Sequence, residues 1–456
     1  MFENKNKSFR WAQCLLFLLA LSLTVHAAMQ SDPGVRGGAP GAGGPIGGLT
    51  VKEGKFFDAG KDAFLERQSV QGTIAGTEAG LGPRFNLDSC GGCHAQPATG
   101  GTSPLGTATA PNPQVAVASG EQAANVAFFI TENGPVREAR FKFVDPPANT
   151  IRDGGVHDLF TIAGRSDAPG CVLPQPNFAT AAAQNNLIFR IPTPVFGAGL
   201  IQAISDATIM ANKSANAPAK AALGISGHEN REGNTGTITR FGWKAQNKSL
   251  VVFSGEAYNV EQGVTNELFP QERDEEHIPS ACLYNPTPED HTNYEETQPQ
   301  KISGDAVNFA NFMLFLAPPT PSPDTPSIIS GRALFTSNSV GCALCHTPTL
   351  QTSYTAFAAL SNKTANLFSD LLVHHMGDGL ADDIIQGSAG PDEFRTAPLW
   401  GVGQRKFFLH DGRTSDLLQA ILAHSSTGSE ATSSIKAFTD LTPAQKQDIL
   451  NFLRSL

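Results

Sequence analysis

Two copies of the pentapeptide Cys-x-x-Cys-His constrain this chain more than any other feature. They occupy residues 90–94 and residues 342–346. Two thiols at this spacing can form thioether bonds to the two vinyl groups of one porphyrin, and the adjacent histidine can then bind the iron as an axial ligand. The sequence therefore predicts two covalently bound haem c groups, around which the chain has to fold.

Zinc coordination and dithiol redox chemistry also use the Cys-x-x-Cys spacing. A zinc site, however, does not need a histidine directly after its second cysteine. A thioredoxin-like pair would sit in a βαβ pattern, and the sequence shows none. The repeated five-residue pattern therefore favours haem. The residues expected to hold the two groups are Cys90, Cys93, Cys342 and Cys345 as thioether positions, with His94 and His346 as iron ligands.

The first 28 residues have the pattern of a secretory signal peptide. Lys5, Lys7 and Arg10 supply the positive start, and residues 15–25 form an apolar run that is too short to cross a bilayer comfortably. An uncleaved membrane anchor is the alternative. Because haem c is attached outside the cytoplasm, we expect export to the periplasm without stable membrane insertion.

The cysteines outside the haem motifs form one candidate pair. Cys14 lies in the expected signal peptide, and four of the seven cysteines lie in the haem motifs, which leaves Cys171 and Cys282. In an oxidising compartment, a leftover pair of this kind favours a disulfide. Two buried free thiols are the alternative.

Composition and length bound the fold class. The chain has 456 residues, enough for two or three domains, and a formal net charge of −10. An acidic chain of this kind is poorly suited to binding nucleic acid or an anionic membrane. Its 45 glycines and 31 prolines predict many loops. We expect a mainly α fold, with two cytochrome-c-like haem domains and a large irregular, partly β insertion.

Shifts in composition suggest where the domains begin and end. Residues 29–50 are rich in glycine and proline and predict a flexible leader. An N-terminal haem c domain is expected over 51–316, with the long insertion at about 99–235. Residues 317–326 form a proline-rich linker, and a C-terminal cytochrome c domain is expected over 327–456.

The helix that closes the chain can be predicted in detail. Thr442 is a favourable N-cap, Pro443 fits the first helical position, and Gln445 completes a capping box. Apolar residues then recur at helical spacing up to the end of the chain.

The sixth iron ligand of the C-terminal haem is expected from another helix. Leu417, Ile421 and His424 lie at positions i, i+4 and i+7 and so share one apolar face. This spacing makes His424 the first candidate ligand, although an isolated core histidine is a common alternative. Met376 is the rival ligand. The consecutive histidines His374 and His375 could line the haem pocket or bind the propionates.

The N-terminal haem has no histidine close behind its motif, since the next one after His94 is His157. An open or water-bound iron is therefore expected there, as a catalytic haem requires. A peroxidase also needs a group that moves a proton between the peroxide oxygens.

Glu261 is the candidate for that group, and Glu256 is the second. A loose repeat supports Glu261, because residues 240–245 precede it much as residues 408–413 precede the helix of His424. Either glutamate could instead be a solvated surface acid.

The mature chain contains two tryptophans, Trp243 and Trp400. Either indole could relay electrons between the haems, and Trp243 is our candidate for a catalytic role. A packed core aromatic is the alternative for both residues.

Six segments of the chain resemble those of a known protein family. They are residues 85–89 (FNLDS), 189–201, 240–245 (RFGWKA), 263–266 (GVTN), 394–400 (FRTAPLW) and 410–413 (HDGR). The family is that of the bacterial di-haem oxidoreductases with peroxidase-like features, also named thiol oxidoreductases with two CxxC motifs. It belongs to the di-haem cytochrome c peroxidase and MauG-like superfamily. The resemblance covers nearly the whole mature chain.

The resemblance implies peroxide reduction at the N-terminal haem, with electrons passed from the C-terminal haem. A small redox protein of the cytochrome or cupredoxin type would then be the donor. Non-catalytic electron transfer and MauG-like oxidation of a partner protein are the alternatives. The superfamily often holds a calcium ion between its domains, but the sequence does not identify ligands for one.

Two positions can be compared with the superfamily directly. Residues 259–263 (NVEQG) resemble the Asn-Pro-x-Glu-Met-Gly context of its active-site glutamate, which supports Glu261. His424 stands where those enzymes place a methionine, which implies a bis-histidine haem of lower potential.

Overall fold

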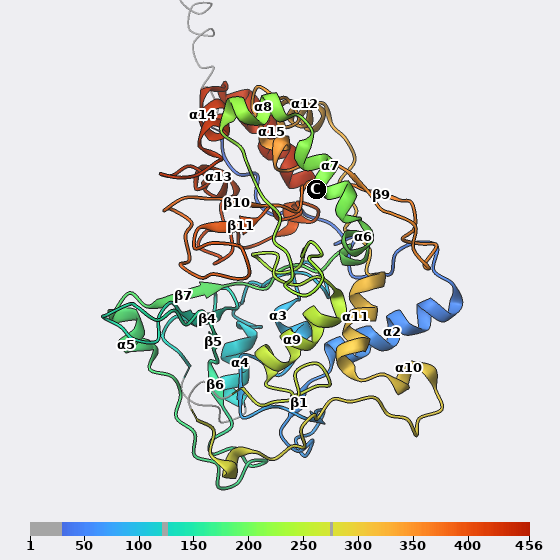
Figure 1. Ribbon diagram of the computed structural model, residues 1–456, viewed down its shortest axis with the longest axis vertical. Helices are drawn as coiled ribbons and strands as arrows, with labels where there is room; N and C mark the ends of the chain where they lie inside the picture. Colours follow the sequence, from blue (N-terminus) through green and yellow to red (C-terminus); the bar gives the residue numbers. More distant parts are fainter. Residues whose placement is uncertain (1–29, 121–125, 274–276) are drawn as a thin grey trace, which may run out of the picture.

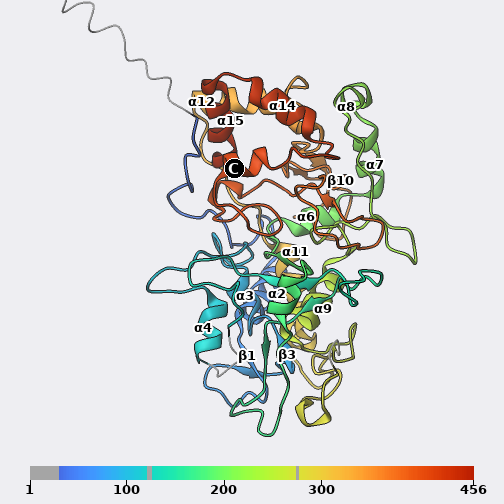
Figure 2. The same cartoon turned by 90° about the vertical axis from the view of Figure 1, so that its left-hand side faces the viewer.

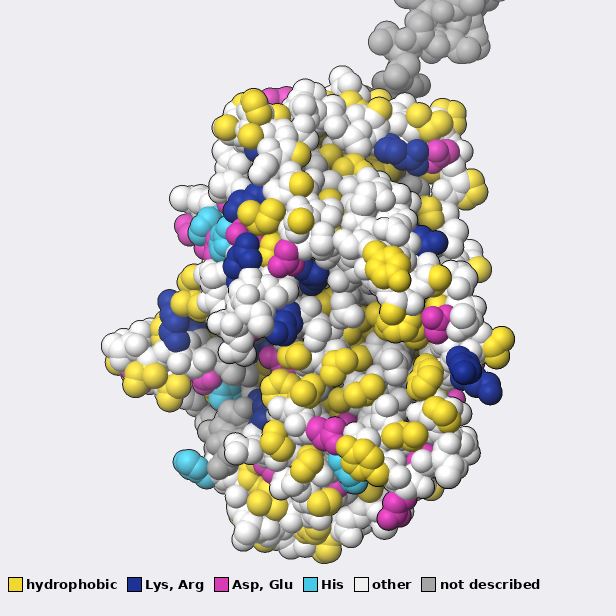
Figure 3. All heavy atoms as spheres, turned by 45° about the vertical axis from the view of Figure 1, so that its right-hand side comes forward, with side chains coloured by type: hydrophobic (Ala, Val, Ile, Leu, Met, Phe, Trp, Pro, Cys, Tyr) yellow, Lys and Arg dark blue, Asp and Glu magenta, His cyan; other side chains and the backbone are white. Residues whose placement is uncertain are grey.

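The computed structural model describes residues 30–120, 126–273 and 277–456, so the expected signal peptide lies outside the described residues. Figures 1 and 2 show the elements in two groups along the long axis of the molecule, with the chain from about 327 onward in the upper group. No helix in these ranges has the length and apolar character needed to cross a membrane. On the face in Figure 3, charged side chains of both signs are interspersed among other groups.

Helices are the main regular elements. The described residues contain the α-helices α2 (Val51–Leu65), α3 (Cys90–Cys93), α4 (Pro113–Gly120), α5 (Phe178–Ala183), α6 (Ala198–Ala203), α7 (Asp206–Ser214), α8 (Ala217–Leu223), α9 (Leu250–Gln262), α10 (Pro299–Ile302), α11 (Asp305–Phe315), α12 (Pro326–Phe335), α13 (Leu417–Leu422), α14 (Thr432–Asp440) and α15 (Pro443–Ser455). Three short 3-10 helices are η1 (Ser280–Cys282), η2 (Cys342–Leu344) and η3 (Val402–Gln404).

The strands are short and form small sheets. They are β1 (Gln68–Ser69), β2 (Glu78–Ala79), β3 (Arg84–Phe85), β4 (Glu138–Phe141), β5 (Val156–His157), β6 (Phe160–Thr161), β7 (Leu187–Arg190), β8 (Leu350–Gln351), β9 (Thr364–Ala365), β10 (Val373–His375) and β11 (Glu393–Arg395). The largest sheet is antiparallel and has the order β5-β4-β7, and the others pair two strands each. A mainly α fold is thus confirmed only in part, because much of the chain is loop.

An aromatic core joins α2 and α11 in the lower group. Helix α2 begins with a capping box at Thr50. The rings of Phe64 and Phe312 pack with their centroids 4.8 Å apart, and Phe64 also meets the ring of His94 at 5.8 Å. The packing of these two helices therefore fixes the position of the first haem motif.

Helices α12 and α15 pack together in the upper group. The predicted capping box of α15 is confirmed, with Thr442 as N-cap, Pro443 in the first turn and Gln445 at its third position. A Cβ atom at Gly331 would overlap the carbonyl group of Asp448, so glycine allows the two helices to approach closely.

The predicted insertion at 99–235 contains the β5-β4-β7 sheet and also helices α4 to α8. Helices α7 and α8 lie beside the upper group in both ribbon views. Asn212 on α7 donates a hydrogen bond to Thr347 Oγ1 at 3.1 Å, directly after the second haem motif. The insertion therefore contributes to the surroundings of both motifs.

Residues 30–50, the predicted leader, contact the rest of the chain. The amide of Thr320 donates to the carbonyl oxygen of Gly41 at 2.9 Å. Near the start of the segment, Arg454 Nε donates to Asp32 Oδ1 at 2.7 Å. The segment thus lies along the proline-rich linker and reaches helix α15.

The predicted disulfide between Cys171 and Cys282 is confirmed. Their Cα atoms are 4.7 Å apart, and the bond links chain positions separated by 111 residues. It ties the insertion to η1 inside the apolar cluster that also contains Phe85 and Phe160.

Candidate functional site

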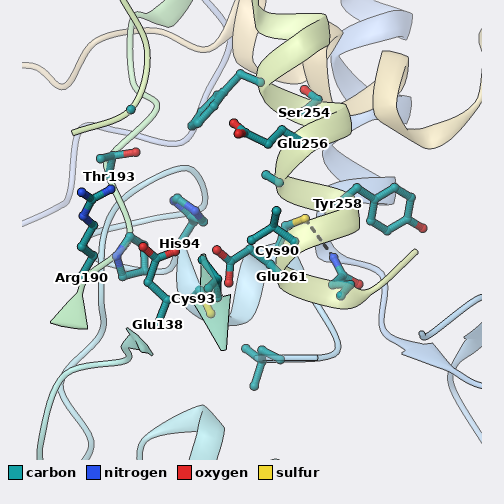
Figure 4. Close-up of a pocket in the computed structure, with 18 of the residues that line it drawn as sticks. Cys90, Cys93, His94, Glu138, Arg190, Thr193, Ser254, Glu256, Tyr258 and Glu261 are labelled. Carbon is teal, nitrogen blue, oxygen red and sulfur yellow. Dashed lines mark hydrogen bonds between the residues drawn. The ribbon is translucent and has the colours of Figure 1, made fainter. Parts of the chain in front are cut away.

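Each Cys-x-x-Cys-His motif lines its own cavity. Cys90, Cys93 and His94 line a cavity of about 330 Å³ in the lower group, part of which Figure 4 shows. Cys342, Cys345 and His346 line a second cavity, of about 220 Å³, in the upper group. His424 and Met376 also line the second cavity, so the structure brings both candidate sixth ligands beside His346.

Three of the predicted iron ligands have the same ring environment. In His94, His346 and His424 the Nδ1 atom faces a backbone carbonyl oxygen, which can only accept a hydrogen bond. The acceptors belong to Gly101, Phe368 and Ala420, at 2.9, 3.0 and 2.8 Å. Nδ1 must therefore carry the proton, and Nε2 is the nitrogen left for a metal.

Burial also favours the neutral form of these imidazole rings. Desolvation lowers the pKa of His94 and of His346 to about 4, and it also lowers the pKa of His424. The rings are therefore neutral at physiological pH, which is the form that binds a metal ion.

Two buried arginines show that the second cavity suits a porphyrin with its propionates. Arg395 and Arg405 line the cavity, and their Nη1 and Nη2 atoms, respectively, have no hydrogen-bond partner in the described structure. Burial lowers the pKa of both to about 10, and the charge of Arg405 adds to the effect on Arg395. A haem propionate would satisfy these donors through charge-assisted hydrogen bonds. The sequence analysis did not identify either arginine.

The adjacent histidines of β10 behave differently from each other. His374 lines the second cavity, but both its ring nitrogens are occupied, Nε2 by Asp370 at 3.0 Å and Nδ1 by Glu430 at 2.8 Å. It is therefore held as a paired cation and is not available as a ligand. His375 has a half-exposed side chain and pairs with Asp392.

His374, Asp370 and Cys345 also form the one group of potential metal-ligating side chains within the described residues. Cys345 is an expected thioether position, so this group belongs to the haem site. The calcium ion that the family resemblance implies stays a prediction.

Glu261 lies in the first cavity together with Cys93 and His94. Asn86 Nδ2 donates to its Oε2 at 3.0 Å, and Glu138 lines the same cavity. Burial, and then the charge of Glu138, raise the pKa of Glu261 well above its usual range. Burial therefore favours the protonated form of Glu261.

Glu256, the second candidate acid, lines the same cavity one and a half turns earlier on α9. Its carboxylate accepts a hydrogen bond from Asn247. Glu261, whose pKa is raised by burial, stays the first candidate for the proton donor.

The three-stranded sheet supplies charged residues to the first cavity that the sequence analysis missed. Glu138 and Arg140 lie two positions apart on β4, so they point to the same face, and Arg190 on β7 pairs directly with Glu138. All three line the cavity, and Arg140 Nε donates to Glu138 at 2.7 Å. The alternation of residues along β4 is a weak sequence signal for these charged groups. Only the fold places β4 opposite α9.

Trp243 lies between the two haem cavities, because its side chain lines both. Its Nε1 donates to the carbonyl oxygen of Ile191 at 2.9 Å, and its ring lies 6.4 Å from that of His410 in the HDGR segment. Trp400 is buried and lines a small cavity nearby, but neither haem cavity.

The chain belongs to the family described as "Di-haem oxidoreductase, putative peroxidase", whose profile matches residues 153–456. This confirms the family resemblance and identifies haem as the class of cofactor and oxidoreduction as the class of function. No curated protein matches the chain.

Three solved structures are similar to parts of the chain. Hydrazine synthase from Kuenenia stuttgartiensis is 16% identical over 38% of this chain and 58% of its own, with a TM-score of 0.24. The diheme peroxidase BthA from Burkholderia thailandensis is 15% identical over 48% and 65%, with a TM-score of 0.29. A MauG-like protein associated with microbial copper homeostasis is 14% identical over 56% and 89%, with a TM-score of 0.28. The chain thus spans less than two thirds of the length of the first two of these proteins.

Proposed function

We propose that this chain is an exported, periplasmic di-haem c peroxidase. Cys90 and Cys93 would attach one haem, and Cys342 and Cys345 the other. A small cytochrome or cupredoxin would deliver electrons to the C-terminal haem, from which they pass to the N-terminal haem. Hydrogen peroxide would be reduced at the N-terminal haem.

The difference between the two cavities is the observation that supports this division of roles. Four histidines line the C-terminal cavity, and one of them, His424, has its Nδ1 held by a backbone carbonyl group as His346 does. Among the described residues that line the N-terminal cavity, His94 is the one histidine, and it shares the cavity with Glu261, whose pKa is raised by burial. An iron with two histidines suits electron transfer, whereas an iron beside a proton donor suits catalysis.

Met313 is the one thioether that lines the N-terminal cavity within the described residues. It lies on α11 one turn from Phe309, whose ring contacts Phe64 at 6.0 Å, and Phe64 in turn contacts His94. Through these ring contacts, Met313 belongs to the part of the cavity wall that lies next to His94. We therefore do not assign it to the sixth position.

Peroxide reduction breaks the O–O bond and consumes two electrons and two protons to give two water molecules. A haem held by Cys90, Cys93 and His94 would supply the redox-active iron for this reaction. The chain would contribute one of the two protons, because Glu261 can donate its O–H to the departing oxygen, which would otherwise leave as hydroxide. Solvent water would supply the other proton. General acid catalysis of this kind accelerates reactions by about 10²–10⁴-fold.

Trp243 would connect the two centres. Because its indole borders both cavities and its Nε1 is held by the Ile191 carbonyl group, the ring has a fixed position between the two cavities. This position favours a relay role for Trp243 over Trp400.

Stopped-flow mixing of the reduced protein with hydrogen peroxide tests the proposal. A peroxidase gives rapid oxidation of both haems and repeated turnover when an electron donor is present. The electron-carrier alternative predicts slow oxidation followed by bleaching, with no turnover. That second result would reject the proposed function.

A further inference from the structure

A buried group of three charges lies beside Trp243, the tryptophan that borders both haem cavities. Asp382 lies in the loop between β10 and β11, and its carboxylate pairs with Arg190 and Lys244. We propose that Asp382 is a positioning residue for electron transfer: its carboxylate holds together the two chain segments that fix the indole of Trp243. This inference rests on the relay role of Trp243 in the proposed function and deepens it.

The two oxygens of the Asp382 carboxylate have different partners. Arg190 Nε and Nη2 both donate to Oδ2, at 3.1 and 2.6 Å, whereas Lys244 Nζ lies 3.0 Å from Oδ1. The exposed fractions of the three side chains are 1% for Asp382, 3% for Arg190 and 0% for Lys244. Because a charge buried in this way is costly without its partner, each of the three side chains depends on the other two for its position.

The first partner of Asp382 adjoins the residue that holds the indole. Arg190 ends β7, lines the first cavity (Figure 4) and is followed directly by Ile191. The carbonyl oxygen of Ile191 accepts the hydrogen bond of Trp243 Nε1 at 2.9 Å. The amide of Ile191 donates to the carbonyl oxygen of His410 at 2.7 Å, and the ring of His410 contacts the indole. Fixing Arg190 therefore fixes the acceptor of the indole N–H.

The second partner of Asp382 directly follows Trp243 in the chain. Lys244 Nζ donates to the carbonyl oxygens of Gly390 and Glu393, at 2.7 and 2.9 Å, in addition to its contact with Asp382. The carbonyl oxygen of Trp243 itself accepts from the amide of Arg395 at 2.8 Å. The backbone at Trp243 is thus held against β11 and the loop before it.

Two amide side chains complete the connection between Arg190 and Lys244. Gln386 Oε1 accepts from Arg190 Nη1 at 2.7 Å. Asn230 Nδ2 donates to the backbone carbonyl oxygens of Gln386 and Lys244, at 2.8 and 2.9 Å. These uncharged groups orient the two cations but do not neutralise them. Within the described parts of the chain, Asp382 is the one carboxylate that forms an ion pair with either cation.

This arrangement has a consequence for the relay. The side chain of Trp243 borders both cavities, so a displacement of the indole changes its separation from both centres at once. Asp382 itself lines neither of the two haem cavities. It therefore acts on electron transfer through Arg190 and Lys244, by keeping the indole and its hydrogen-bond acceptor in register.

Replacing Asp382 with asparagine in the haem-loaded protein tests the inference. Asp382→Asn keeps the shape of the side chain but leaves two buried cations without their counter-charge, so the segments of Ile191 and Trp243 should separate. Ultraviolet resonance Raman spectroscopy reports the hydrogen bond of the indole N–H, and subtracting the spectrum of Trp243→Phe isolates this indole from the other tryptophans. The band of Trp243 should shift to that of a weaker hydrogen bond.

The same variant should slow electron transfer between the haems, measured after a flash that reduces one of them. We expect a decrease of about tenfold or more, because reactions between positioned groups can lose about 10²-fold in rate for a displacement of 1 Å. Wild-type values of both the indole band and the transfer rate in Asp382→Asn would overturn the inference.

A matched control separates positioning from general destabilisation. Asp167 pairs with Arg165 at 3.0 Å, their side chains are 0% and 1% exposed, and neither residue lines a haem cavity. Asp167→Asn should reduce stability but leave the indole band and the transfer rate unchanged. If it altered both as much as Asp382→Asn does, the effect would be unspecific and the inference would be wrong.

A double variant keeps the test decisive if Asp382→Asn does not fold, as judged by haem content. Asp382→Asn combined with Lys244→Gln has the same net charge in this group as the wild type but lacks the bridging carboxylate. The indole band and the transfer rate should still change, and wild-type values would overturn the inference. Equal transfer rates in wild type and Trp243→Phe would instead reject the relay itself. Because no peroxide is used, neither result depends on the proposed peroxidase activity.

Discussion

Replacing Glu261 with glutamine removes the proposed proton donor with little change in shape. The amide oxygen of glutamine can still accept the hydrogen bond that Asn86 donates at 3.0 Å, so the side chain should keep its place. What is lost is an acidic proton in a buried site. Loss of general acid catalysis should slow peroxide turnover by about 10²–10⁴-fold, which corresponds to about 3–5 kcal/mol in the activation barrier.

The assay is stopped-flow oxidation of the reduced protein at several peroxide concentrations, with haem content and spectra measured in parallel. Because the effect should lie in the chemical step, the oxidation rate at saturating peroxide should fall while both haems stay attached. A change of less than about tenfold would refute the assignment of Glu261. If Glu256→Gln produced the larger loss, Glu256 would be the proton donor.

The raised pKa of Glu261 also predicts a stability difference with a defined sign. Since the folded protein keeps this proton and the unfolded chain releases it above about pH 4.5, stability of the wild type falls as pH rises past that value. Glu261→Gln has no proton to release. The difference in unfolding free energy, variant minus wild type, should therefore increase as pH rises. Denaturant titrations at pH 4 and pH 8 measure this difference, and an unchanged value would contradict the raised pKa.

Three further variants test other parts of the structure. His424→Ala should convert the C-terminal haem from low spin to high spin, and an unchanged low-spin spectrum would point to Met376 as the ligand. Trp243→Phe should slow electron transfer between the haems without changing either resting spectrum, and equal rates of transfer in rapid-mixing experiments would reject the relay. Replacing both Cys171 and Cys282 with alanine opens a link between positions 111 residues apart. Loop entropy then predicts a loss of up to about 5 kcal/mol in unfolding free energy. A loss below about 1 kcal/mol in denaturant titration would show that the unfolded chain is already restricted.

Local sequence patterns predicted the features that depend on nearby residues. The two Cys-x-x-Cys-His motifs located both cavities, and the Thr442 capping box located the last helix. Counting the cysteines predicted the disulfide, because only one pair was left. The helical spacing of His424 placed it in the cavity of His346, since one face of α13 and the residues after it points inward.

Features that depend on contacts between distant segments were missed. Glu138 and Glu261 are more than a hundred residues apart but line one cavity, because β4 and α9 converge on it, and no local pattern encodes this. Arg395 lies in a segment that the family resemblance singled out, but its unpaired buried nitrogen is visible only in the folded chain. The glycine-rich leader was expected to be flexible from its composition, yet its contacts are made by the backbone and by Asp32.

The coordination state of the two irons is the most direct measurement of the central claim. Electron paramagnetic resonance of the oxidised protein should show one high-spin haem and one low-spin haem in equal amounts. The high-spin signal should persist in Met313→Leu and be the one that responds to peroxide. Two low-spin haems in the resting protein, neither of which changes on adding peroxide, would contradict a catalytic N-terminal haem and support an electron carrier.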